Sequence, residues 1–271
     1  NGIGGASFSP LYHQQDGLSL QPGMPCSASA LVLNAFEDNP FRTDYYNELK
    51  TEWDSRGIKT TLDTSVSLED FLQFAKYDIT ILAMHGCMYR GEPVVCPNDS
   101  AASMQTDRRY REHLTQQEIC KVYSGGSWEY WILPSFFRNH YPDNELNGVL
   151  IFSESCMFFG DDSQSASTVY SMSGAFTQKS QCAVIGFHNS VNAEYSRNFM
   201  KLFVENVAVG LSLSESFDDA VREYGAADSI ADPNAAYPIM QQTCRGGDSG
   251  DISPEPTPEL TPATGPTASP E

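Results

Sequence analysis

The chain has 271 residues, of which 40% are hydrophobic, and carries a formal net charge of −19 at pH 7. This length suits one α/β domain with a tail, and the apolar content is enough to bury a sizeable core. The negative charge argues against nucleic acid or an anionic membrane as a partner, and it favours cationic substrates. Because no apolar run is long enough to span a bilayer, we expect no membrane insertion.

The first third of the chain alternates short apolar runs with amphipathic segments. A strand is predicted over Ser29–Phe36, a helix over Thr43–Arg56 and a second strand over Ile58–Leu62. The segment Ser67–Asp70 forms an N-cap pattern for a helix that carries, on one face, Leu68, Phe71, Leu72 and Ala75. This alternation predicts an α/β fold, a three-layer sandwich of a mostly parallel sheet with helices on both faces.

Two further apolar strands lead into residues that can do chemistry. The strand Asp78–Gly86 ends in His85 and Gly86, and the run Val149–Phe152 is followed closely by Cys156. Ligands of open α/β sheets bind at the carboxyl ends of the strands, so neighbouring strands would bring imidazole and thiol to one edge. Taken singly, such a cysteine is more often a small core residue, and such a histidine is more often structural. Together they form a nucleophile with an adjacent base, because the histidine lowers the thiol pKa and can protonate a leaving group.

The long connection between these strands contains three local patterns. Gly91–Pro97 predicts a hairpin at the sheet edge, and Thr115–Glu118 is a capping box that predicts a short helix. The aromatic, turn-rich stretch Ser124–Trp131 is favoured as a satellite cluster packed under a loop, with an overhang above the site as the alternative.

The remaining segments complete an α/β pattern. Gly160–Ser167 predicts a mobile loop, Thr168–Thr177 a helix and Cys182–Phe187 a strand. Ala193–Val209 is a strongly amphipathic helix, and a final capped helix is predicted to end at Tyr224.

Composition divides the chain into three parts. We expect a leader over residues 1–25, a folded domain over 26–245, and a Pro/Thr-rich disordered tail or linker over 246–271. The first residues read like the middle of a longer protein from which a signal has been cut. We therefore expect an extracellular or cell-surface location, as a fragment of a larger exported protein.

The seven cysteines allow several interpretations. If Cys156 is a free nucleophile, the other six permit up to three disulfides. A zinc set could be drawn from Cys87, Cys96, His113 and Cys120, but it lacks a Cys-x-x-Cys pair and is disfavoured. With that set disfavoured we expect no metal, and we expect no cofactor.

The order of these segments resembles the caspase-like fold shared by caspases, metacaspases, clostripain, gingipains and separase, and by bacterial CHAT domains. Those proteins place an apolar strand before His-Gly and a later apolar strand before the catalytic cysteine. The matching segments here are TILAMHG and VLIFSESC, with looser matches at LTQQEI, where such families start a helix, and at CAVIGFHNSV. The stretch GLSLSESFDDAVREYG looks like the closing helix of CHAT-type domains, so the resemblance spans about Ala28 to Tyr224.

This resemblance implies a cysteine endopeptidase in which Cys156 is the nucleophile and His85 the general base and acid. It also implies an oxyanion hole formed by the backbone N–H groups of Gly86 and Cys156. His188 is a rival base, better interpreted as a rim residue because the family's histidine precedes glycine and comes before the cysteine.

Substrate preference would depend on carboxylates near the cysteine. Glu154 lies two residues before Cys156, so in strand geometry both side chains point the same way. In clostripain-like enzymes and metacaspases an Asp at the matching position binds Arg or Lys. Glu37 and Asp38 follow the first strand, so we expect a protein or peptide substrate that is basic at the cleavage site. The alternative for Glu154 is a structural hydrogen bond.

Two other functional classes fit the same sequence. A non-catalytic surface or interaction module could keep this fold, although the His85 and Cys156 pair favours the enzyme. A small-molecule binder on a flavodoxin-like sheet is weaker, because no Gly-rich phosphate loop follows any strand.

Overall fold

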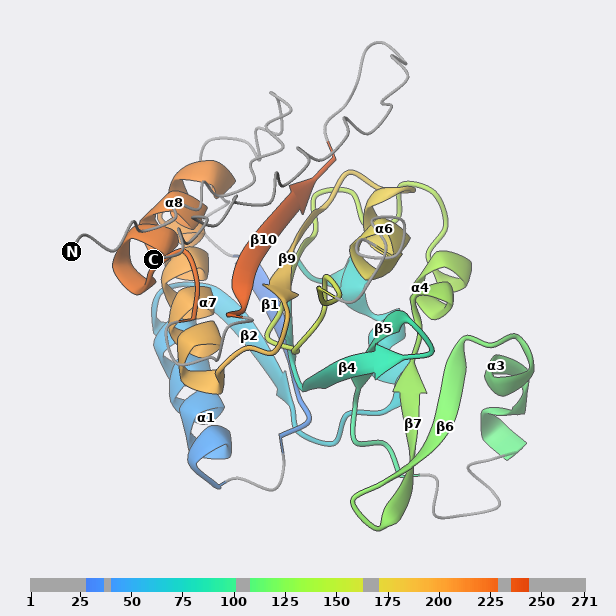
Figure 1. The fold of residues 1–271 in the computed structure, drawn as a ribbon. Coiled ribbons are helices and arrows are strands. Elements are labelled where there is room, and N and C mark those ends of the chain that lie inside the picture. The colour runs from blue at the N-terminus through green and yellow to red at the C-terminus, as the bar shows by residue number, and fades with distance from the viewer. Residues whose placement is uncertain (1–27, 37–39, 101–107, 163–170, 229–234, 244–271) are drawn as a thin grey trace, which may run out of the picture.

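A computed structural model describes residues 28–36, 40–100, 108–162, 171–228 and 235–243 (Figure 1). The fold is α/β, as predicted. It contains a mixed, mostly parallel sheet, a separate antiparallel sheet, and helices. Within the described residues, no helix is both long and apolar enough to cross a membrane.

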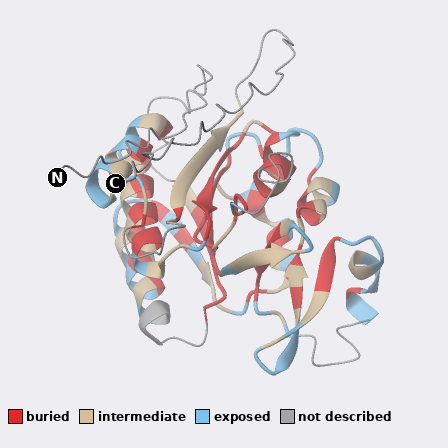
Figure 2. Ribbon diagram, viewed as in Figure 1, coloured by how far each residue is buried: buried red, intermediate tan, exposed pale blue. Residues whose placement is uncertain are grey.

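The larger sheet has six strands among the described residues. Their order is β10-β9-β8-β3-β1-β2, with bounds β1 Ala28–Asn34, β2 Ile58–Asp63, β3 Ile79–Ala83, β8 Leu150–Ser153, β9 Ala183–His188 and β10 Tyr237–Gln242. All neighbouring pairs are parallel except β9 and β10. The central strands are buried apolar runs, which is the pattern of a parallel sheet covered on both faces (Figure 2).

The smaller sheet is antiparallel and is inserted between β3 and β8 in the chain. Its order is β4-β5-β7-β6, with bounds β4 His85–Tyr89, β5 Glu92–Cys96, β6 Ile119–Ser124 and β7 Ser127–Ile132. Each hairpin has a two-residue turn with both residues at positive φ, Arg90-Gly91 and Gly125-Gly126. Such turns match the twist of paired strands, which explains the glycines.

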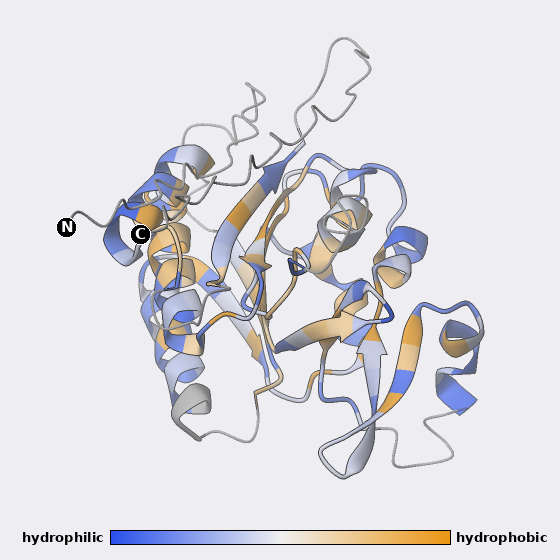
Figure 3. Cartoon of the chain, viewed as in Figure 1, coloured by the Kyte–Doolittle hydropathy of each residue, from blue (hydrophilic) through white to orange (hydrophobic). Residues whose placement is uncertain are grey.

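Helices lie on both sides of the larger sheet. Their bounds are α1 Pro40–Ser55, α3 Arg111–Thr115, α4 Pro134–His140, α6 Ser171–Thr177, α7 Ala193–Ala208 and α8 Leu213–Tyr224. In Figure 1, α1, α7 and α8 cover one face, whereas α4, α6 and the smaller sheet lie towards the other. Hydrophilic residues gather on the outward surfaces of α1 and α8 (Figure 3).

The described side chains form two apolar clusters, one on each face of the larger sheet. Along β1, Leu31 and Leu33 belong to one cluster, whereas Ala30 and Val32 belong to the other. This alternation follows from the two-residue repeat of a strand. Trp53 of α1 is fully buried in the cluster beneath α1 and α7.

Two predicted helices are wrong. The segment after Ser67 has the predicted capping box, but it forms two short 3₁₀ helices, Leu68–Leu72 and Phe74–Lys76. The tighter turn buries Phe74 and leaves the expected core residue Leu72 41% exposed. The box at Thr115–Glu118 opens no helix, because α3 ends there and β6 begins at Ile119.

Other parts of the prediction need correction. The stretch Ser124–Trp131, favoured as a satellite cluster packed under a loop, is the turn of the β6–β7 hairpin with most of β7. It leaves Trp128 exposed and buries Tyr130 in an apolar cluster. The hairpin near Gly91–Pro97 exists but belongs to the second sheet. The predicted loop over Gly160–Ser167 lies largely outside the described residues. The strand β10 and the helix α4 had no predicted counterpart.

Candidate functional site

Cys156 lies just beyond the carboxyl end of β8. This strand pairs in parallel with β3, and the last register pair is Leu82 with Ser153. The N–H of Glu154 then donates to the carbonyl of Leu82 at 3.0 Å, so the two chains stay together past the strand ends. As predicted, the segments that carry histidine and cysteine leave neighbouring strands at the same edge.

His85 differs from its expected place at the end of a strand. The strand β3 stops at Ala83, and His85 is the first residue of β4 in the smaller sheet. Its side chain is exposed, and its ring meets the ring of Phe36 edge-on at a centroid distance of 5.0 Å. The prediction of one continuous strand over Asp78–Gly86 is therefore wrong, because the chain changes sheets at the buried Met84.

Gly86 joins the two segments. A Cβ atom at this position would lie 2.3 Å from the carbonyl oxygen of Cys156 and 2.8 Å from the Cβ of Ser155. No side chain fits at such distances, so only glycine allows this approach of the two backbones. The contact holds the residue after His85 directly against Cys156.

The chain turns sharply at Cys156. Met157 has a φ of 55°, which is uncommon for a residue with a long side chain, and its N–H donates to the carbonyl of Asn189 at 2.8 Å. The half-buried Cys156 thiol donates to the carbonyl of Val191 at 3.7 Å. The thiol thus faces the segment that leads into α7.

Glu154 is buried and bound to α1. The hydroxyl of Tyr46 donates to its Oε1 at 3.0 Å. Burial, and then the negative charge of Glu154, raise the pKa of Tyr46 well above its usual range, and the same two causes raise the pKa of Tyr45. Glu154 therefore makes the structural hydrogen bond considered from the sequence, and its carboxylate faces α1.

A cavity of about 340 Å³ opens between α1 and α7 beside Tyr45. Its lining carries three carboxylates and one guanidinium, from Asp44, Tyr45, Glu48, Glu194, Arg197 and Asn198. The hydroxyl of Tyr45 donates to the carbonyl of Arg197 at 3.3 Å and so ties the two helices together. Sequence reasoning missed this cavity, although the spacing of Asp44 and Glu48 on one helical face was visible. The expected pocket residues Glu37 and Asp38 lie outside the described residues.

His188 is not a rim residue. It is 4% exposed, its Nε2 lies 3.0 Å from Oδ1 of Asp162, and its Nδ1 lies 3.2 Å from the carbonyl oxygen of Phe159. Both ring nitrogens are thus engaged in the fold, so the prediction of a rim position is wrong.

The cysteines are free thiols in the part of the chain that the structure describes: Cys87, Cys96, Cys120, Cys156 and Cys182. Three disulfides are therefore excluded, because too few cysteines are left outside the described residues. The Cys96 thiol donates to Cys87, and this hydrogen bond lowers the pKa of Cys87 and raises that of Cys96. His113, drawn into the disfavoured zinc set, pairs with Glu118 instead.

No family model matches this chain, and no curated protein matches it significantly in sequence.

Proposed function

We propose that the chain is a cysteine endopeptidase with a caspase-like fold. Cys156 attacks the scissile carbonyl carbon as a thiolate after His85 has taken the thiol proton. His85 then gives that proton to the departing amine as the C–N bond breaks. Water hydrolyses the resulting thioester, which releases the acid product and restores the thiol.

The contact between Gly86 and Cys156 carries this proposal. It joins an exposed histidine, which follows β3, to a half-buried cysteine, which follows the neighbouring parallel strand β8. Ligands of open α/β sheets bind at this edge. The close backbone approach also keeps Gly86 beside Cys156, and we propose that the N–H groups of these two residues form the oxyanion hole.

A preference for Arg or Lys before the cut bond is the second part of the proposal. The carboxylates of Asp44, Glu48 and Glu194 line a cavity between α1 and α7, and the Cys156 thiol faces the segment that leads into α7. Glu154 is buried near enough to Tyr45, which also lines the cavity, for its negative charge to act on that side chain. A guanidinium or ammonium group in such surroundings gains charge-assisted hydrogen bonds that a neutral side chain cannot form.

The alternative function is a non-catalytic interaction module with the same fold. A peptidyl acyloxymethyl ketone that carries Arg or Leu next to the warhead separates the two, because it alkylates only an activated and accessible thiol. We expect labelling of wild-type protein at Cys156, located by peptide mass spectrometry, and none in Cys156→Ala.

The matched control is Cys87→Ser, since Cys87 is the other half-buried thiol among the described residues. This variant should label like the wild type. Wild-type protein that reacts only at Cys87, or that resists the probe altogether, would favour the non-catalytic module.

A further inference from the structure

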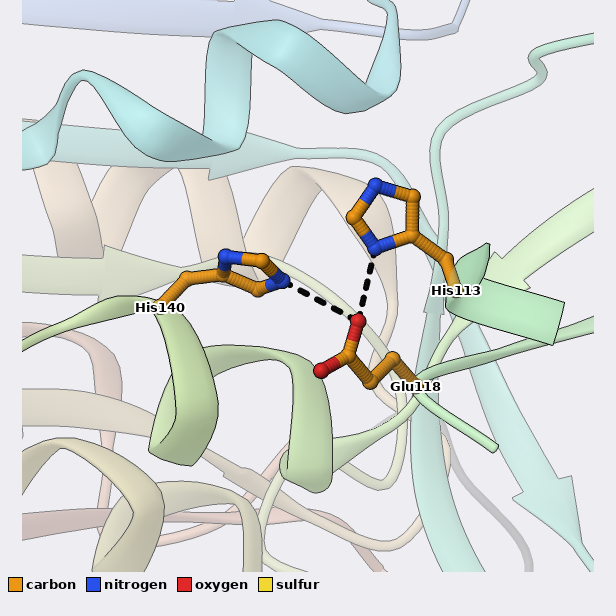
Figure 4. A group of neighbouring side chains, drawn as sticks. All are labelled: His113, Glu118 and His140. Atoms are coloured by element: carbon orange, nitrogen blue, oxygen red, sulfur yellow. Dashed lines mark hydrogen bonds and ion pairs between the residues drawn. The ribbon is translucent and has the colours of Figure 1, made fainter. Parts of the chain in front are cut away.

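Three side chains from separate elements meet at one carboxylate oxygen. His113 lies in α3, Glu118 directly precedes β6, and His140 ends α4 (Figure 4). Nδ1 of His113 lies 2.6 Å from Oε2 of Glu118, and Nε2 of His140 lies 3.0 Å from the same oxygen. These three atoms all lie within 4.8 Å of one another.

The local fold holds Glu118 in this position. After α3, the chain reverses at Gln117, which has a φ of 57°. The N–H of Glu118 donates to the carbonyl of His113 at 2.9 Å, and the N–H of Leu133 donates to the carbonyl of Glu118 at 2.9 Å. Asn139 fixes the carboxylate itself, because its Nδ2 donates to Oε1 at 2.7 Å.

The Glu118 carboxylate is buried, accepts a hydrogen bond from Asn139, and lies within hydrogen-bonding distance of both imidazoles. Its side chain is 1% exposed, whereas those of His113 and His140 are 22% and 29% exposed. The imidazoles therefore form the solvent-facing side of the group, from which an ion and a water ligand could enter.

The surroundings are typical of a metal centre. The buried ring of Phe136 lies 5.7 Å from the ring of His113 and 4.6 Å from that of His140, measured between centroids, and walls the group on its apolar side. Asn139 acts on the carboxylate in the way that outer partners orient metal ligands. Two imidazoles and one carboxylate are also the protein ligands of several open zinc sites.

We propose that His113, Glu118 and His140 bind one Zn²⁺ ion, with water as the fourth ligand. Ligand atoms at about 2.0–2.2 Å from zinc lie roughly 3.3–3.6 Å apart in a tetrahedron, so modest rotations of the imidazoles create the site. The ion would connect α3, the start of β6 and α4, and so stabilise the region around the smaller sheet. It is separate from the Cys156 site and does not depend on the proposed peptidase activity.

The test is a Zn²⁺ titration of the full chain after chelator treatment, by isothermal calorimetry and by thermal unfolding. We expect one ion per chain and a higher Tm with zinc. His113→Gln and His140→Gln should each weaken binding about 100-fold or more, since an amide is a poor zinc ligand. The matched control Glu112→Gln, which changes an exposed carboxylate of the same helix, should bind like the wild type.

Thiols are the competing zinc ligands, so two further variants locate the ion. Cys96→Ser and Cys156→Ala should keep the full affinity, and loss of binding in either would overturn the proposal. So would an absence of binding to the wild type, or unchanged binding in both histidine variants. If a histidine variant fails to fold, the absorption spectrum of Co²⁺ bound to the wild-type protein identifies the metal ligands instead. Bands of nitrogen and oxygen ligation support the site, and a thiolate-to-cobalt charge-transfer band refutes it.

Discussion

Replacing Gly86 by alanine tests the contact that brings the two candidate catalytic segments together. The new Cβ would lie 2.3 Å from the Cys156 carbonyl oxygen, whereas real Cβ contacts stay beyond 3.0 Å, so the segments must separate by about 0.7 Å. The atoms that the new Cβ would meet belong to the backbone or to the Ser155 Cβ, so no flexible side chain can move aside. Overpacking of this kind costs about 1–3 kcal/mol of folding free energy. A shift of nearly 1 Å at the reacting atoms costs on the order of 100-fold in turnover.

The assay measures kcat/KM on an Arg peptide together with urea unfolding of the same preparations. Gly174→Ala in α6 is the matched control, because its Cβ would meet only the flexible end of Gln178 at 3.3 Å. That variant should keep turnover and gain about 0.5–1 kcal/mol from the better helix former. If Gly86→Ala kept both wild-type turnover and wild-type stability, the close approach of these backbones would be refuted.

Three further predictions concern the base, the pocket and the acid stability. His85→Ala should reduce turnover about 100-fold or more, and near-normal rates on a peptide substrate would remove it from the dyad. Glu154→Gln should lower the preference for Arg over Leu peptides at least about tenfold, or roughly 1.4 kcal/mol; an unaltered preference would show that the buried charge of Glu154 does not act on the bound side chain. The hydrogen bonds from Lys50 and from the N–H of Thr60 lower the pKa of Asp54. Its stabilising contribution is therefore present above the unfolded pKa of about 3.9 and is lost as pH falls through the lower folded value. Unfolding of wild type and Asp54→Asn from about pH 7 down to about pH 3 should show a difference that shrinks in acid, and a difference independent of pH would contradict this.

The strands and long helices were predictable because one local pattern decides each of them. The run Leu31–Leu33 is buried on both faces, and Tyr46, Leu49 and Trp53 share one buried face of α1 at helical spacing. The smaller sheet was less predictable, because its hairpins depend on turn pairs such as Gly125-Gly126 and on partners far along the chain. The capping box at Thr115–Glu118 shows the limit of prediction from local patterns. The side chain of Glu118 caps no helix and instead hydrogen-bonds with His113, Asn139 and His140.

In the candidate site, too, the sequence predicted what local patterns decide and missed what depends on residues far apart in the chain. The placement of His85 and Cys156 at one edge followed from two apolar strands and the rule that neighbouring parallel strands end together. The sequence could not show that Tyr46 hydrogen-bonds Glu154, because 108 residues separate them. Nor could it show the cavity between α1 and α7, which exists only once both helices pack on the same face.

The change of sheets at Met84 has a consequence for how the molecule would lose activity. Cys156 follows a strand of the six-stranded sheet, whereas His85 opens the four-stranded one, so the proposed dyad straddles the seam between a larger and a smaller structural unit. Partial melting of the smaller unit would carry the imidazole away while the thiol stayed in place. Such subglobal openings need less free energy than complete unfolding. Mild denaturant would therefore abolish the proposed activity while Trp53 of α1 still reported an intact parallel sheet by fluorescence, measured in a variant with Trp128 and Trp131 of β7 replaced by Phe.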